Sequence, residues 1–229
     1  MTGPHGRPAG LAIRTVLFDL DGTLLDTAPD LADALNRVLE DNGRPPLPFD
    51  LIRPVVSHGG IALIDIGFGL AHTDPQFELL RAQLLKVYRA NISRKTRPFP
   101  GMAEVLDTLE ARGINWGVVT NKPGWLTDPL LHDLGLHTRA ACVVSGDTLD
   151  ERKPHPAPML HACEQAGSSP AECVYIGDAQ RDIEAGINAG MHTVVALFGY
   201  IPADDDPRAW QADAEINTPG ELLNWLDSR

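Results

Sequence analysis

The chain has 229 residues, of which 43% are hydrophobic and 22% are charged, and these fractions exclude a disordered or fibrous protein. Lysine and arginine total 19 against 31 aspartate and glutamate residues, a net charge of −12, and the absence of basic clusters argues against nucleic-acid binding. An anionic substrate therefore needs local positive charge at its site, from a metal ion or from one or two lysines.

The N-terminal segment and the cysteines indicate the cellular compartment. Residues 1–11 are rich in glycine and proline, lack the apolar middle of a signal peptide and are typical of a flexible tail. No apolar run approaches the roughly 20 residues that cross a bilayer. Cys142, Cys163 and Cys173 lack the spacing of a zinc site or a disulfide framework, so we expect buried, reduced thiols. These features predict a cytoplasmic protein.

Short apolar runs, bounded by turn residues or charges, predict the strands of a sheet. They are rich in valine and lack regular polar alternation, which is typical of strands buried on both faces of a parallel sheet. The runs are Thr15–Leu20, Trp116–Asn121, Cys142–Ser145, Cys173–Asp178 and Thr193–Leu197. Amphipathic helical patterns that end at Gly113, Gly135 and Gly190 lie between them. The alternation predicts an α/β fold, with a Rossmann-like doubly wound parallel sheet.

One long stretch after the first strand contains only helical patterns. Apolar residues at helical spacing run from Leu31 to Leu39 and from Phe77 to Tyr88, and a shorter helix is expected between Gly60 and Leu70. The return segment 97–101 combines prolines with a glycine and is a candidate hinge. The expected division is a tail at 1–11, a core domain at 12–27 and 98–229, and an inserted helical cap domain at 28–97.

The most informative segment is Phe18–Thr27, in which Asp19 and Asp21 follow the first strand. Two carboxylates two residues apart point to the same side at the carboxyl edge of the sheet, where α/β folds bind ligands. Their crowding costs stability unless a cation is bound. One carboxylate can act as a nucleophile and the other as a general acid and base, whereas the alternative is a pair that merely caps the following helix.

Three further segments carry residues suited to a phosphate group and a metal ion. Thr120 and Asn121 end a strand with hydrogen-bond donors, and Lys153, which precedes a proline, supplies positive charge. Asp178 suits an oxygen-preferring ion such as Mg2+, and Asp182 lies about one helical turn further on, where it can orient the water shell or Lys153. Taken singly, each residue has an ordinary alternative as a turn former, a solvated lysine or a helix-start acid. Their order along the chain is what makes the set specific.

This set of motifs resembles that of the haloacid dehalogenase superfamily of phosphatases, with Asp19 and Asp21, Thr120, Lys153, and Asp178 with Asp182 as the matching residues. The resemblance covers nearly the whole chain, and the helical insertion is similar to the family's cap. It implies that Asp19 attacks phosphorus to form an aspartyl phosphate, and that Asp21 protonates the leaving oxygen and later activates water. It also implies Mg2+ bound by Asp19, the Asp21 carbonyl and Asp178, with Thr120, Asn121 and Lys153 at the phosphate.

The substrate implied by the resemblance is a small phosphorylated metabolite. The first motif, the hinge and the cap length resemble phosphoglycolate phosphatases, while Trp116–Pro123 and Gly199–Ile201 also resemble N-acetylmuramic acid 6-phosphate phosphatases. The loop Ser57–Gly60, with His58, Gly59 and Gly60, is the candidate for substrate specificity, since the glycines allow close approach and His58 can contact a carboxylate. The alternative for this loop is an ordinary turn between cap helices.

Two other functions remain open at this stage. A phosphosugar mutase of the same family would return the phosphoryl group to its substrate and would need a bisphosphate activator. A phospho-receiver or sensor also carries an aspartate at a strand end, but it needs neither the insertion nor Asp21. We expect a monomer or a homodimer with no nucleic-acid or membrane partner.

Overall fold

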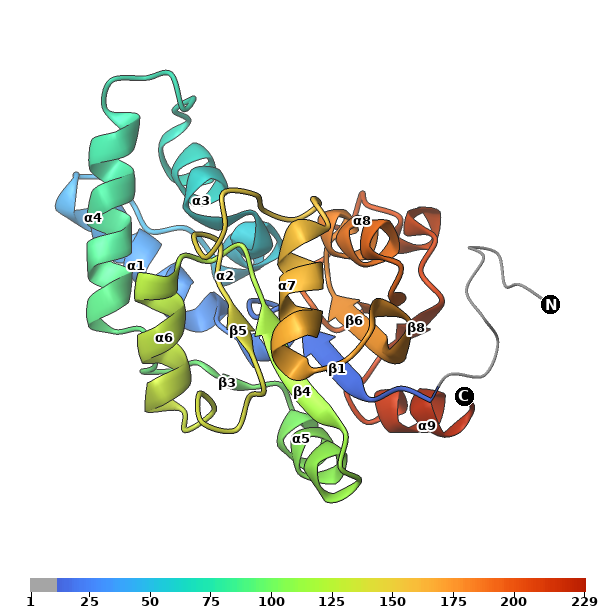
Figure 1. The fold of residues 1–229 in the computed structure, drawn as a ribbon. Helices are drawn as coiled ribbons and strands as arrows, with labels where there is room; N and C mark the ends of the chain where they lie inside the picture. Colours follow the sequence, from blue (N-terminus) through green and yellow to red (C-terminus); the bar gives the residue numbers. More distant parts are fainter. Residues whose placement is uncertain (1–11) are drawn as a thin grey trace.

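The computed structural model describes residues 12–229, and the predicted tail at 1–11 lies outside the described residues. Within that range the core is a six-stranded sheet in the order β5-β4-β1-β6-β7-β8, with every neighbouring pair parallel (Figure 1). The strands are β1 Thr15–Phe18, β4 Asn115–Val119, β5 Val143–Val144, β6 Cys173–Gly177, β7 His192–Ala196 and β8 Ala214–Ile216. The predicted doubly wound parallel sheet is confirmed.

Helices cover both faces of the sheet, as successive side chains of β1 illustrate. Val16 and Phe18 belong to the apolar cluster that includes the buried faces of α5, α6 and α9. Leu17 belongs to a separate cluster with residues of α7 and α8, because neighbouring side chains in a strand point to opposite faces. The helices are α5 Met102–Ala111, α6 Gly124–Asp133, α7 Ala157–Ala166, α8 Gln180–Ala189 and α9 Glu221–Asp227, with short 3-10 turns η2 Pro170–Glu172 and η3 Pro207–Trp210.

Some strands differ from their predicted extents. The run Cys142–Ser145 contributes only Val143–Val144 to the ladder, and β1 ends at Phe18 rather than Leu20. The edge strand β8 was not predicted, since its three residues include the exposed Glu215 and have no apolar run to mark them. Short edge strands carry too little pattern for recognition from sequence alone.

Between β2 and β3 the chain is helical, in agreement with the helical patterns found in this stretch (Figure 1). The elements are α1 Ala28–Asp41, α2 Phe49–Ile52, η1 Arg53–His58, α3 Gly59–Phe68 and α4 Phe77–Ala90. Helices α1, α3 and α4 pack on one another, and their buried residues belong to the same apolar cluster as Phe18 of the core. We call residues 28–97 the helical insertion.

One part of the insertion differs from the expectation that no apolar run approaches the roughly 20 residues that cross a bilayer. Phe49–Phe68 spans 20 residues with a mean hydropathy of 1.3, enough by length and composition for a membrane-spanning helix. The structure divides this stretch into α2, η1 and α3, with Pro54 at the start of the 3-10 segment and Gly59 at a φ of 72°. It is therefore not one continuous α-helix, and Leu63 and Ile64 are buried within the insertion.

A small antiparallel sheet, which the sequence patterns did not predict, joins the two ends of the insertion. Strand β2 (Leu25–Asp26) pairs with β3 (Arg97–Pro98), and the Phe99 N–H donates to the Leu24 carbonyl at 3.3 Å. The two crossings between core and insertion therefore lie side by side. The predicted hinge segment 97–101 begins within this sheet and ends at Gly101. Gly101 has a φ of 86° and immediately precedes α5.

The three cysteines are buried and free, as predicted. Burial raises the pKa of the Cys142 thiol to about 12. The Sγ atoms of Cys163 and Cys173 lie 3.5 Å apart and form a hydrogen-bonded contact rather than a disulfide. These thiols are packing groups of the core.

Replacing Tyr200 by phenylalanine is expected to destabilise the fold where the chain passes from β2 into the helical insertion. The buried Tyr200 hydroxyl donates to Asp26 Oδ1 at 2.6 Å and accepts from the Ala28 N–H at 2.9 Å. Losing both partners leaves buried polar groups unsatisfied, which costs about 1–3 kcal/mol. Urea denaturation should show a lower midpoint with an unchanged m value. An unaltered midpoint would mean that these hydrogen bonds contribute no net stability.

Candidate active site

The residues singled out in the sequence come together at the carboxyl edge of the sheet. Asp19 follows β1, Thr120 follows β4, and Asp178 follows β6, while Lys153 comes from the loop before α7. The Asp19 N–H still donates to the Ile176 carbonyl at 2.8 Å, so its position is fixed by the ladder between β1 and β6. Parallel strands all end at one edge, which explains how residues so far apart in sequence meet there.

Lys153 is the cationic centre of this group. Its ammonium lies 2.8 Å from Asp19 Oδ1 and 2.8 Å from Asp182 Oδ1, and it also donates to the Tyr175 hydroxyl at 2.8 Å. The residue is only 4% exposed. Burial by itself lowers the pKa of Lys153, but Asp182 and Asp19 outweigh it and hold the pKa above its ordinary value. Lys153 therefore keeps its charge and supplies the local positive potential that the acidic chain needs.

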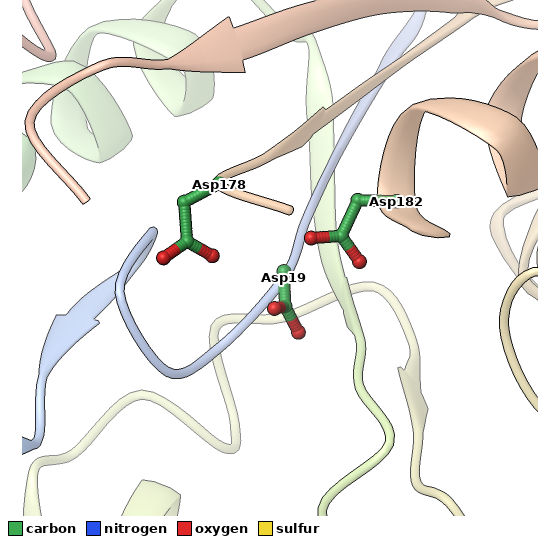
Figure 2. A group of neighbouring side chains, drawn as sticks. All are labelled: Asp19, Asp178 and Asp182. Carbon is green, nitrogen blue, oxygen red and sulfur yellow. The ribbon is translucent and has the colours of Figure 1, made fainter. Parts of the chain in front are cut away.

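Asp19, Asp178 and Asp182 form a buried carboxylate cluster (Figure 2). Each offers an oxygen atom, and these oxygens all lie within 4.8 Å of one another. Burial and the neighbouring charges of Asp19 and Asp182 raise the pKa of Asp178 to about 7. Burial likewise raises the pKa of Asp19, with Lys153 opposing the shift. Lys153 offsets part of this buried negative charge, and a bound metal cation would offset more.

The donor set fits a hard divalent cation. Carboxylate and carbonyl oxygens are the ligands that Mg2+ prefers, and Figure 2 shows the three carboxyl groups facing a common space. The Ser57 hydroxyl donates to Asp178 Oδ2 at 2.8 Å and lies 3.5 Å from the Asp21 carbonyl oxygen. The Asp178 carboxylate and the Asp21 carbonyl, both predicted metal ligands, are therefore close to the same side chain. A Cβ at Gly22, whose φ is +86°, would overlap the Asp178 carboxylate, so glycine is what leaves room for it.

The Asp21 side chain is held apart from the carboxylate cluster. Its Oδ1 accepts from the Thr27 hydroxyl at 2.6 Å and from Lys122 Nζ at 2.9 Å. Lys122 was not among the predicted site residues, although it directly follows Thr120 and Asn121. Burial lowers the pKa of Lys122, but Asp21 and Tyr88 more than compensate, so the net shift is upward. Asp21 and Lys122 thus form a second ion pair beside the first.

Thr120 and Asn121 lie at the site but use some of their donors within the protein. The Thr120 N–H, expected to be available to an anion, donates instead to the Val144 carbonyl at 2.9 Å because the ladder with β5 extends to it. Its hydroxyl accepts from the Lys122 N–H at 3.1 Å and has its own proton left to donate. The Asn121 side chain exchanges hydrogen bonds of 3.1 Å with the backbone of Lys153. Asn121 therefore positions the lysine.

The helical insertion closes one side of a cavity of about 650 Å³ that contains Asp19, Asp21 and Lys153. The predicted specificity residues His58, Gly59 and Gly60 line this cavity. Burial and the nearby Arg181 lower the pKa of His58, against a smaller opposing effect of Asp205. This shift favours a neutral imidazole, so His58 is a hydrogen-bonding group at neutral pH rather than a cation.

Cationic side chains hold the insertion against the core. Arg181 of α8 donates to the Ser57 carbonyl at 2.7 Å, and Arg53 of η1 donates to the Phe198 carbonyl at 3.1 Å. Lys122 Nζ lies 4.6 Å from the centre of the Tyr88 ring. Arg181 and Lys122 escaped sequence-based prediction, and Ser57 was predicted only as part of the specificity loop, because their contacts join residues far apart in the chain. The one available signal was their position beside the predicted motifs.

Comparison with known proteins identifies the family. A family model described as haloacid dehalogenase-like hydrolase matches residues 16–196. The chain belongs to the haloacid dehalogenase-like hydrolases. The matched range includes every predicted catalytic and metal-binding residue, from Asp19 to Asp182.

Two relatives and one solved structure match this haloacid dehalogenase-like hydrolase over almost its full length. The chain is 46% identical over 210 residues to a phosphoglycolate phosphatase of Xanthomonas campestris pv. campestris (strain 8004). The aligned region covers 91% of this chain and 94% of the relative. It is 40% identical over 217 residues to an N-acetylmuramic acid 6-phosphate phosphatase of Pseudomonas aeruginosa, with coverages of 95% and 96%. A crystal structure of a predicted phosphoglycolate phosphatase from Haemophilus somnus 129pt matches with a TM-score of 0.80 at 29% identity, covering 93% and 97%. These matches confirm the predicted phosphoric monoester hydrolase class.

Proposed function

We propose that the chain is a Mg2+-dependent phosphomonoesterase that hydrolyses a small phosphorylated metabolite through an aspartyl phosphate on Asp19. The observation that carries this proposal is the buried Lys153 ammonium, 2.8 Å from Asp19, in a cavity shared with a second carboxylate, Asp21. A nucleophile, a cation and a separate acid and base thus line one space.

Asp19, Asp178 and the Asp21 carbonyl would hold the Mg2+ ion. When bound, the ion supplies positive charge that offsets the negative charge of the carboxylates and of a phosphate group. Asp182, paired with Lys153 and accepting from the Ala179 N–H at 3.1 Å, positions the lysine from the other side. Lys153 and the Thr120 hydroxyl would donate to the phosphoryl oxygens as their charge develops.

The reaction takes place in two steps at the phosphorus atom. An Asp19 carboxylate oxygen attacks phosphorus while the bond to the leaving oxygen breaks, and Asp21 gives that oxygen a proton. Asp21 then takes a proton from a water molecule, whose oxygen attacks the phosphorus of the aspartyl phosphate. The P–O bond to Asp19 breaks, which frees inorganic phosphate and restores the carboxylate. Thr27 and Lys122 hold Asp21 in place for both proton transfers.

Phosphoglycolate is the first candidate substrate, because the relative at 46% identity is named for that activity. N-acetylmuramic acid 6-phosphate is the second, and two observations favour it. A relative at 40% identity is named for it, and a cavity of about 650 Å³ has room for more than a two-carbon acid.

The proposal is tested by measuring phosphate release from both candidates, from pyrimidine nucleotides and from hexose phosphates, with the purified full chain. We expect one substrate to reach a kcat/KM within about 10⁴ to 10⁸ M⁻¹s⁻¹, and chelation of the metal by EDTA to abolish turnover. Phosphate transfer to another sugar position, dependent on a bisphosphate activator, would instead indicate a mutase. A stable phosphoaspartate without turnover on any ester would support a receiver.

Magnesium is expected to stabilise the protein more at high pH than at low pH. In the metal-free folded protein the pKa of Asp178 is about 7, against an ordinary value of 3.8, so its side chain stays protonated over most of the pH interval between the two. The folded state therefore binds more protons than the unfolded state between these values, and metal-free stability falls as the pH rises through this interval. Since the metal needs ionised ligands, the rise in Tm on adding Mg2+ should be larger at about pH 8 than at about pH 5.5.

Thermal unfolding with and without Mg2+ measures this difference. Asp178→Asn is the control, since it removes both the titrating group and a ligand and should abolish the Mg2+-dependent rise in Tm. An equal rise in the wild-type protein at both pH values would contradict the assignment of Asp178.

A further inference from the structure

The mouth of the active-site cavity is formed by residues that the proposed chemistry does not use. Trp125 of α6 lies on the core side, while Arg81 and Leu85 of α4 lie on the insertion side. These three residues line both the cavity of about 650 Å³ and an adjoining hollow of about 390 Å³. We call Trp125, Arg81 and Leu85 the cavity rim. The hollow therefore adjoins the cavity along these three residues.

Trp125 is a largely exposed aromatic residue beside the active-site cavity. It is 49% exposed, and among the described residues it belongs to none of the buried apolar clusters. Its backbone is well fixed, because it lies in the first turn of α6 and the preceding Gly124 N–H donates to Asp147 Oδ1 at 2.7 Å. Trp125 follows Thr120 by five residues, so the segment after β4 carries both Thr120 and the indole at the rim. An exposed aromatic ring on a fixed backbone beside a cavity is a suitable contact for the apolar face of a ligand.

Arg81 supplies positive charge opposite the tryptophan. Its stem packs over Gly60, where an added Cβ would lie 3.4 Å from Arg81 Cγ. Its side chain is 37% exposed, with Nε 3.2 Å from Glu78 Oε2. Lys86 and Arg89 also line the adjoining hollow, and Glu78 is the acidic residue in that lining. The lining of the hollow thus has more basic than acidic residues in a chain whose net charge is −12, and a guanidinium group is well suited to bind a carboxylate.

From this arrangement we infer that the cavity rim is a subsite for the body of a phosphorylated sugar acid. The apolar face of the sugar ring lies on Trp125, and the carboxylate pairs with Arg81, while the phosphate is at Asp19. This inference rests on the proposed function and deepens it, because it favours the second candidate substrate over the first and names the residues that select it. A two-carbon phosphoester fills only the inner part of the cavity and gains less from the rim.

The test compares kcat/KM for N-acetylmuramic acid 6-phosphate and 2-phosphoglycolate in the wild-type protein and in Trp125→Ala. We expect the ratio of the two constants to fall by about tenfold to a hundredfold, mainly through KM for the sugar acid, as a lost aromatic contact predicts. Leu79→Ala is the matched control, since Leu79 is a 62% exposed apolar residue of α4 outside both linings. It should leave the ratio unchanged.

Arg81→Met separates the carboxylate contact from the sugar contact, since methionine keeps an apolar stem over Gly60. Here the comparison is between N-acetylmuramic acid 6-phosphate and N-acetylglucosamine 6-phosphate, which lacks the carboxylate. We expect Arg81→Met to lower the preference for the acid by about tenfold or more, and Trp125→Ala to weaken both sugars. Equal losses on every substrate in both variants would mean that the rim does not select the substrate and would overturn the subsite.

A binding measurement keeps the subsite separate from the proposed reaction. Calorimetry compares N-acetylmuramic acid 6-phosphate binding to Asp19→Asn and to Asp19→Asn combined with Trp125→Ala. Binding that depends on Trp125, in a protein whose wild type releases no phosphate, would overturn the proposed function and support the subsite. Binding that is absent, or independent of Trp125, would overturn the subsite whatever the enzymatic activity.

Discussion

Asp19→Asn is expected to abolish phosphate release while the protein stays folded. Asparagine has nearly the same shape as aspartate, so the packing at the end of β1 is kept, but its amide is not a nucleophile. The loss in kcat should be at least about 10³-fold, the scale on which a nucleophile acting together with its partners is lost. Phosphate release from the best substrate of the panel measures it.

The folded state of this variant follows from the electrostatics of the site. Burial raises the pKa of Asp19, so its charge is unfavourable in the metal-free protein, and Lys153 keeps Asp182 as a partner at 2.8 Å. Metal-free Asp19→Asn should therefore unfold at the same Tm as the wild type or above it. Asp50→Asn, at an exposed position on α2, is the control for purification and contaminating phosphatases. Wild-type turnover in a folded Asp19→Asn protein would refute the proposed nucleophile.

Lys153→Met should have the largest effect on stability. Methionine fills a similar volume but leaves Asp19 and Asp182 as buried carboxylates without their cation. Breaking a buried ion pair from one side costs about 3–5 kcal/mol, and the loss of a charged donor at the phosphate should lower kcat by about 10²- to 10³-fold. Urea denaturation at neutral pH and phosphate release measure the two effects.

Second variants identify the cause of the instability. Lys153→Met combined with Asp182→Asn removes one of the uncompensated carboxylates, so part of the lost stability should return without any activity. Lowering the pH should also stabilise Lys153→Met relative to the wild type, because protonation removes the unpaired negative charges. If Lys153→Met unfolds at the wild-type urea concentration at neutral pH, the ion pairs have no net role in folding.

The core of the site could be predicted from sequence because its geometry comes from one rule. Asp19, Thr120 and Asp178 each end an apolar run, and parallel strands all present their carboxyl ends at one edge. The buried runs Val16–Phe18 and Val174–Ile176 mark those strands without ambiguity. Lys153 and Asp182 were found because they lie next to such strand ends or to the helices that follow them.

The rest of the site depends on contacts between core and insertion that no local pattern encodes. The Ser57 hydroxyl meets Asp178 across 121 residues of sequence, and Lys122 is buried partly by Tyr88 of α4. In the sequence alone, a lysine after a strand is an ordinary surface residue, and Ser57 stands out only as part of the specificity loop. Their roles appear only when the insertion is placed on the core.

The junction formed by β2 and β3 has a consequence for how such proteins diversify. Because Leu25 pairs with Pro98 and Asp26 with Arg97, everything between these points leaves and re-enters the core through two adjacent strands. Segments whose ends lie close together are readily exchanged as units. Exchange of residues 28–97 at this junction for the helical module of another family member is therefore expected to leave Asp19, Lys153 and Asp178 in place and to change the residues that line the insertion side of the cavity.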